Sequence, residues 1–155
     1  NRLIKNTIEL AQVDVNCRAI RFEFDFFEQL PMIEIVLGQI QQVILNLIRN
    51  ACDAMITTSA DQKCITVISE NHPVGFITIR VRDRGIGINR DHNDKLFRAF
   101  FSTKSYGMGM GLAISHSIIS NHGGEMKINH QYKDGAEIIF TLPVTPTFKG
   151  QPDGR

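Results

Sequence analysis

The spacing of hydrophobic residues predicts a helix over residues 38–56, where apolar positions recur every three or four residues. Gln42, Asn46, Asn50 and Asp53 recur at the same spacing on another face, so their side chains form a row. Asn is unfavourable inside a helix because its side chain competes for backbone hydrogen bonds. The row is therefore either a solvated outer face or a set of groups that hold a hydrated metal ion and a polar ligand.

The remaining pattern predicts the other elements. Helical spacing recurs over residues 2–12 and 112–122, and Gly123-Gly124 provides a stop for the second of these helices. Alternating or continuous apolar runs predict strands. These runs cover residues 19–25, 64–70, 76–83, 125–131 and 136–142, with a further short strand over residues 32–37.

This order of elements predicts an α+β fold with a single two-layer α/β sandwich. We expect a mixed, mostly antiparallel sheet of about five strands, with three main helices on one face. Residues 89–111 are longer than an ordinary connection, and long loops in compact domains are usually functional. The domain is expected to span residues 1–143, followed by a Pro- and Gly-rich linker or tail over residues 144–155.

Composition narrows the functional classes. The net charge of +1 offers no electrostatic argument for binding nucleic acid or an anionic membrane. No apolar run approaches the roughly 20 residues that span a bilayer. The three cysteines lack a C-x-x-C spacing and predict free thiols in a reducing compartment, with Cys52 packed in a helix. Because the chain begins at Asn1 rather than Met, we expect a domain cut from a longer protein.

A carboxylate followed by two glycines ends the predicted strand 76–83. Asp83 can accept a hydrogen bond from an exocyclic amine, which adenine carries at a position where guanine has a carbonyl. Gly85 and Gly87 allow a ligand to approach the backbone closely. Taken alone, D-x-G-x-G is also compatible with an ordinary turn.

A second glycine cluster, at Gly107, Gly109 and Gly111, leads directly into the predicted helix 112–122. Backbone amides at a helix N-terminus bind anions, although a plain flexible loop has the same composition. The spacing is neither a P-loop nor G-x-G-x-x-G. Between the two glycine clusters, residues 97–104 combine aromatic residues with Ser102, Thr103 and Lys104, which can contact phosphates. Core packing of each Phe, with a solvated Lys104, is the simpler alternative.

Taken together and in this order, these segments resemble the ATP-binding catalytic domain of bacterial sensor histidine kinases. That domain belongs to a superfamily shared with gyrase, the ninety-kilodalton heat-shock chaperone and mismatch-repair ATPases. The resemblance covers residues 1–143 and is closest to the nitrogen-regulation and oxygen-sensor kinases. It rests on the N box (42–55), the G1 box (83–87), the F box (97–101) and the G2 box (107–112).

The resemblance implies that Asn50 ligates Mg²⁺ and that Asn46 helps to place the metal and the phosphates of ATP. Phosphate oxygens and water would complete the octahedral shell of the ion. Asn46, Asn50 and Lys104 are the expected catalytic residues. The expected nucleotide-binding set is Asn46, Asn50, Asp53, Ala54, Asp83, Gly85, Gly87, Ile88, Phe97, Ser102, Thr103, Lys104, Gly107, Gly109, Gly111 and Leu112. Within it, Asp53 and Ala54 line the nucleoside pocket, and residues 102–111 form a lid over the phosphates.

One position separates the kinases from the ATP-hydrolysing members of the superfamily. The hydrolases have a water-activating Glu one helical turn before the metal-binding Asn, and this chain has Asn46 there. An amide cannot act as a general base, which favours transfer of phosphate to a partner side chain. The alternatives are an ATP hydrolase of the same fold and a nucleotide-binding module without catalysis.

The resemblance also implies partners that the chain itself lacks. None of its five histidines has the sequence context of the phosphate acceptor. The acceptor is therefore expected on a separate dimerisation domain, from which the helix 2–12 would continue, and phosphate would pass onward to a response regulator receiver domain. We expect a cytoplasmic location, no direct membrane contact and no nucleic-acid partner. The chain departs from many relatives at Gly135-Ala136, where they carry Gly-Thr, and it lacks the Asp that often precedes the N box.

Overall fold

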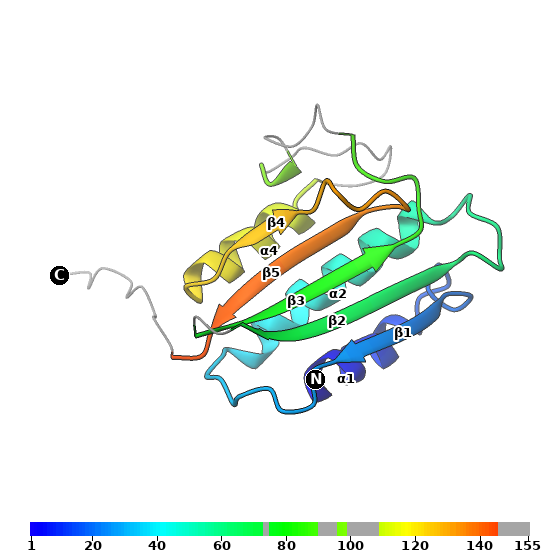
Figure 1. Cartoon of the computed structure of the whole chain (residues 1–155). Helices are drawn as coiled ribbons and strands as arrows, with labels where there is room; N and C mark the ends of the chain where they lie inside the picture. Colours follow the sequence, from blue (N-terminus) through cyan, green and yellow to red (C-terminus); the bar gives the residue numbers. More distant parts are fainter. Residues whose placement is uncertain (73–74, 90–95, 99–108, 146–155) are drawn as a thin grey trace.

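Five strands form one sheet within the described part of the chain (Figure 1). The computed structural model describes residues 1–72, 75–89, 96–98 and 109–145. The strand order is β1-β2-β3-β5-β4; β1 and β2 are parallel, and the other neighbouring pairs are antiparallel. The strands are β1 (Arg21–Phe26), β2 (Cys64–His72), β3 (Phe76–Asp83), β4 (Met126–Ile128) and β5 (Glu137–Pro143).

The helices pack together on one face of this sheet (Figure 1). They are α1 (Arg2–Ala11), α2 (Leu37–Ala54) and α4 (Gly111–Asn121). The central helix α2 packs against α1 on one side and α4 on the other, and it lies over β2 and β3. Its apolar face is fully covered, with Val43 and Ile48 both 0% exposed. The predicted two-layer α+β sandwich is therefore confirmed.

The boundaries of the elements follow the sequence pattern closely. Strand β3 covers the predicted residues 76–83, and α2 and α4 each begin one residue earlier than predicted. Strand β4 is limited to Met126–Ile128; the Asn129 amide still donates a hydrogen bond to the Glu137 carbonyl, and the chain then turns at residues 130–131.

The short strand predicted over residues 32–37 is wrong. The segment joins no sheet, and α2 begins at Leu37 with Val36 as its N-cap. Ile33 and Ile35 are half-buried and pack against the core, whereas Met32 is 95% exposed. Half-buried and exposed side chains alternate along residues 31–36, but the segment pairs with no strand of the described sheet. The periodicity was genuine, but it reported burial rather than hydrogen bonding.

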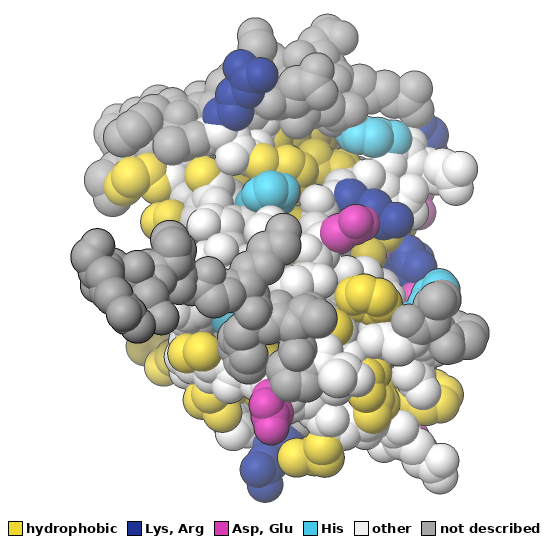
Figure 2. Space-filling view, turned by 90° about the vertical axis from the view of Figure 1, so that its left-hand side faces the viewer, with side chains coloured by type: hydrophobic (Ala, Val, Ile, Leu, Met, Phe, Trp, Pro, Cys, Tyr) yellow, Lys and Arg dark blue, Asp and Glu magenta, His cyan; other side chains and the backbone are white. Residues whose placement is uncertain are grey.

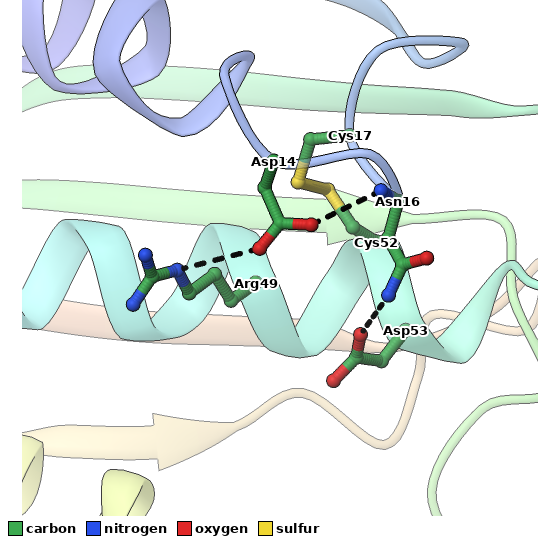
Figure 3. The surroundings of a disulfide bond; sticks show 6 residues. All are labelled: Asp14, Asn16, Cys17, Arg49, Cys52 and Asp53. Carbon is green, nitrogen blue, oxygen red and sulfur yellow. Dashed lines mark hydrogen bonds and ion pairs between the residues drawn. A yellow bond between two sulfur atoms is a disulfide. The ribbon is translucent and has the colours of Figure 1, made fainter.

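The prediction that all cysteines are free thiols is also wrong. Cys17 and Cys52 form a disulfide across 35 positions of sequence, with their Cα atoms 5.4 Å apart, and Cys64 is free (Figure 3). This Cα separation is usual for a disulfide. The pair was missed because α2 packs against the segment that follows α1, and the spacing of the cysteines along the chain does not reveal that contact.

The face of the sheet opposite the helices carries a network of charges centred on Glu137. This carboxylate is 0% exposed and accepts a 2.6 Å hydrogen bond from Nε of Arg82. Arg80 lies 3.8 Å away, and the Asn129 amide also donates to Glu137. A buried carboxylate is tolerated when it is paired and hydrogen-bonded in this way. The network fixes the end of β4 to β5 beside the turn that precedes β5.

The face shown in Figure 2 has no separate positively or negatively charged patch among the described residues. Basic, acidic and hydrophobic side chains of the described residues are interspersed there. This distribution agrees with the net charge of +1.

The covered face of α2 predicts a large difference between two leucines of the same helix. Leu47 is 1% exposed, whereas Leu37 is 60% exposed. Leu47→Ala should lower the free energy of unfolding by about 2–5 kcal/mol because it leaves a cavity in the core. Leu37→Ala should change it by no more than about 0.5 kcal/mol. Urea denaturation of both variants checks this, and equal losses would contradict the packing described for α2.

Candidate nucleotide-binding site

The polar row of α2 lies between the two predicted glycine segments. At the end of α2, the carbonyl of Ala54 accepts a hydrogen bond from the amide of Ile86, at 3.2 Å. A little over two turns earlier along α2, the side chain of Asn46 donates a hydrogen bond to the carbonyl of Gly111 at the start of α4. The C-terminal half of α2, the segment after β3 and the first turn of α4 therefore meet at one end of the sheet (Figure 1).

Asn46 is held by two hydrogen bonds to α4. Its Nδ2 donates to the carbonyl of Gly111 and to Oγ of Ser115, both at 3.3 Å. A carbonyl can only accept, so the nitrogen of the amide must face α4. The Oδ1 atom consequently faces the other way and can accept hydrogen bonds or ligate a cation. Ser115 is 0% exposed, so this support is buried.

Asp83 ends β3 with its carboxylate fixed by the backbone. Its Oδ1 accepts hydrogen bonds from the amides of Gly85, at 2.8 Å, and Ala136, at 3.2 Å. Among the described residues, Oδ2 receives no hydrogen bond. This atom is the acceptor that the sequence predicted for an exocyclic amine, and the carboxylate has no freedom to turn away.

Burial raises the pKa of the Asp83 carboxyl above its ordinary value of 3.8, because the charged form loses its hydration. The two backbone hydrogen bonds oppose this shift by stabilising the charged form. Asp83 is 6% exposed. Such a buried and incompletely paired acceptor gains from any ligand that donates a hydrogen bond to it.

The glycines after Asp83 are required by the chain itself. A Cβ on Gly85 would lie 2.5 Å from the carbonyl oxygen of Ala54, and Gly87 has a φ of +73°. Gly135 packs against Asp83 so closely that a Cβ would overlap the Asp83 carbonyl. The sequence predicted Gly85 and Gly87 as points of ligand approach. In the structure, the absence of side chains at these glycines allows α2, β3 and β5 to pack closely against one another.

Asn50, Asp53 and Ala54 continue the row of α2, and all three side chains are half-buried. Asp53 accepts a 3.2 Å hydrogen bond from Nδ2 of Asn16, in the segment after α1 (Figure 3). The described residues contain no group of three or more His, Cys, Asp or Glu side chains that could hold a metal ion. The amide oxygens of Asn46 and Asn50 suit Mg²⁺ only together with phosphate oxygens and water, which is a usual arrangement for this ion.

The described residues on either side of the predicted lid include Phe97, which lies near α4. The ring of Phe97 is 5.1 Å from that of His116, between centroids, and Phe97, Ile88 and Leu112 pack against the core. Gly109 has a φ of +66° just before the helix begins. The predicted residues Ser102, Thr103, Lys104 and Gly107 lie outside the described residues.

Three residues of this site escaped the sequence analysis: Ser115, Gly135 and Asn16. Ser115 follows Gly111 by one helical turn, so its contact with Asn46 could have been proposed once both helices were placed side by side. Gly135 was noted only as a departure from relatives. Asn16 has no local signal, because its contact depends on how the segment after α1 returns to α2.

One site thus combines the polar residues of α2, the Asp83 carboxylate at the end of β3 and the glycine-rich start of α4. This combination is typical of one class of ATPase fold. The family described as "Histidine kinase-, DNA gyrase B-, and HSP90-like ATPase" matches residues 36–146. The chain belongs to this family. Its predicted resemblance to the catalytic domains of sensor histidine kinases is confirmed by relatives in both sequence and structure.

Among curated relatives, the chain is similar to the sensor histidine kinase ZraS of Escherichia coli O157:H7, with 35% identity over 99% of this chain. It is similar to the sensor protein FixL of Bradyrhizobium diazoefficiens, with 41% identity over 80% of this chain. The chain spans 32% of ZraS, and its match spans 24% of FixL. The catalytic domain of histidine kinase ThkA has a TM-score of 0.79 at 29% identity, and the match covers 94% of this chain and 93% of that domain.

The described helices include none that combines the length and the apolar character needed to cross a membrane.

The raised pKa of Asp83 predicts a pH-dependent stability difference between the wild type and Asp83→Asn. The asparagine Oδ1 can accept both backbone hydrogen bonds without carrying a charge. Since the folded state holds the Asp83 proton more tightly than the unfolded state does, wild-type stability falls as pH rises from about 3.8 through the raised pKa.

Urea denaturation of both proteins over this pH range should therefore show Asp83→Asn gaining stability relative to the wild type as pH rises. The difference should level off above the raised pKa. Contributions from other carboxyls cancel in the comparison. A difference that is constant with pH, or that moves in favour of the wild type, would contradict the buried environment described for Asp83.

Proposed function

We propose that this chain binds Mg-ATP between the polar row of α2, the end of β3 and the start of α4, and transfers the γ-phosphate to a histidine. The acceptor histidine lies on a separate dimerisation domain, and the phosphate then passes to an Asp of a response regulator receiver domain. The observation that carries the proposal is Asp83, whose Oδ1 is tied to two backbone amides while Oδ2 is left for an amine. The domain acts in the cytoplasm, where ATP is supplied.

Each of the three elements around the site contacts a different part of ATP. Asp83 accepts a hydrogen bond from the adenine amine, and Asp53 and Ala54 lie along the nucleoside. The amide oxygen of Asn50 would ligate Mg²⁺, and Asn46 would help to place the metal and the phosphates; the ion would supply positive charge that offsets the charge of the phosphates. The start of α4 directs backbone amides and the positive end of the helix dipole at the phosphates. Ser102, Thr103, Lys104 and Gly107 complete the phosphate contacts from the lid.

Asn46 favours phosphoryl transfer to a side chain over hydrolysis. Its amide has no basic nitrogen, and its Nδ2 is already engaged with Gly111 and Ser115. The residue can position a metal or a phosphate but cannot remove a proton from water. The nucleophile that attacks the γ-phosphate of bound ATP is therefore supplied by another domain. The relatives named above are sensor kinases, which supports the same assignment.

Asp83→Asn tests base recognition. In this variant Oδ1 still accepts the two backbone hydrogen bonds, so Nδ2 takes the place of Oδ2. Nδ2 and the adenine amine are both donors and cannot form a hydrogen bond with each other. ATP affinity should fall about tenfold or more, since a buried donor is left without a partner. GTP affinity should hold or rise, because Nδ2 can donate to the guanine carbonyl.

Isothermal titration of both nucleotides in Mg²⁺ measures these affinities. Asp61→Asn provides the control, because Asp61 is an exposed residue of the loop between α2 and β2 and is not part of the proposed site. If Asp83→Asn and the control bind ATP equally well, Asp83 does not read the base. If the wild type binds no ATP in Mg²⁺, the proposed function itself is wrong.

Phosphate transfer is tested with γ-labelled ATP. The chain alone should acquire no stable label, since none of its histidines has the acceptor context. Adding a His-bearing dimerisation domain as a separate protein should place acid-labile, base-stable label on that partner. Asn50→Ala should abolish the labelling. Steady release of inorganic phosphate at the same rate with and without the partner would instead favour an ATP hydrolase. Nucleotide binding without labelling of the partner and without phosphate release would favour a binding module.

A further inference from the structure

The Cys17–Cys52 disulfide joins the segment after α1, residues 12–20, to the last turns of α2 (Figure 3). Cys52 directly precedes Asp53, a residue of the proposed nucleotide site. Cys17 is the buried anchor of an otherwise largely exposed segment: Val13 and Val15 are 68% and 76% exposed. One covalent bond therefore connects the segment between α1 and β1 to the residue next to Asp53.

Two further contacts accompany the bond, and both are at the surface. Asn16 donates a 3.2 Å hydrogen bond to Asp53, and Asp14 lies 3.9 Å from Arg49 (Figure 3). The Asp14 and Arg49 side chains are 39% and 55% exposed, and ion pairs of this kind contribute little. Hydrogen bonds within residues 10–20 shape the segment locally, and the disulfide is its covalent link to α2, next to both Asn16 and Asp53.

We propose that Cys17 and Cys52 form a redox-active site that couples the thiol–disulfide state to nucleotide binding. In the oxidised form, the bond holds Asn16 on Asp53 and fixes the end of α2. In the reduced form, residues 12–20 separate from α2, and Asp53 loses this partner. The coupling to nucleotide rests on the proposed function, whereas the redox chemistry of the pair does not.

The reductant is a thiol, either a small one such as glutathione or a protein dithiol. Its thiolate attacks one sulfur, the Cys17–Cys52 bond breaks, and a mixed disulfide forms while the other cysteine leaves as a thiolate and takes up a proton. A second reductant thiolate then attacks the mixed disulfide, which releases the remaining cysteine thiol and an oxidised reductant. Two electrons and two protons are taken up in total. Cys17 and Cys52 are 0% and 1% exposed, so attack requires the exposed segment to open first.

Differential alkylation tests the redox site itself. The native full chain is equilibrated in glutathione buffers of graded ratio, quenched, alkylated and weighed by mass spectrometry. Cys17 and Cys52 should change together between a disulfide and two alkylated thiols within this range, and Cys64→Ser should behave like the wild type. A bond that stays closed at every ratio would make it a structural cross-link only. Thiols that stay free at every ratio would also overturn the proposal.

Titration with Mg-ATP tests the coupling. The reduced wild type should bind about fivefold more weakly than the oxidised form, or weaker still, which is the size of an ordinary coupling between sites. Cys17→Ser should bind like the reduced form whatever the buffer, whereas Cys64→Ser should keep the redox response. Asn16→Ala should lower the affinity of the oxidised form toward that of the reduced form.

The ATP affinities in the two redox states distinguish a failure of the redox coupling from a failure of the proposed function. Equal ATP affinity in both redox states, in protein whose disulfide is seen to open and close, would overturn the coupling. Absence of ATP binding in both states would refute the proposed function. In that case hydrogen exchange at residues 12–20 decides the redox site, because the proposal requires faster exchange there on reduction, and unchanged exchange would overturn it.

Discussion

The burial of one face of α2 is the constraint on which the rest of the structure depends. The helix is wedged between α1 and α4 and lies over the centre of the sheet, so its rotation about its own axis is fixed by packing. Fixing that rotation also fixes the direction of every polar side chain along its flank. The hydrophobic residues of α2 therefore place Asn46, Asn50 and Asp53, although none of these contributes to the core.

A second constraint is the crowding of backbone around Asp83. Three chain segments, from the end of α2, the end of β3 and the start of β5, come within hydrogen-bonding distance of one another there. The Asp83 carboxylate is 6% exposed, and two backbone amides within these segments orient it. A polar group held in this way is prepared for its ligand before the ligand arrives, so less binding energy is spent on ordering the site.

The sequence predicted the layers of the fold because burial periodicity and turn residues are local properties. The ordered motifs, which resemble a known catalytic domain, also led to Asn46, Ala54 and Asp83 as candidate site residues, and the structure places all three at one end of the sheet. It failed where two segments distant in sequence meet. Residues 32–37 alternate as a strand does but find no partner strand, and the Cys17–Cys52 pair and the Asn16–Asp53 contact both depend on how the chain returns to α2. Ser115 was missed for a related reason, because its role is to hold another side chain rather than a ligand.

The close packing at Gly85, Gly124 and Gly135 limits how this sequence can change over evolutionary time. Each position faces a backbone carbonyl at a distance that leaves no room for a methyl group, and backbone on both sides is fixed by the sheet and helices. A descendant that had lost ATP binding would still need these glycines in order to fold. Glycines at these positions therefore identify the architecture, and their presence in a related sequence says nothing about whether that sequence binds a nucleotide.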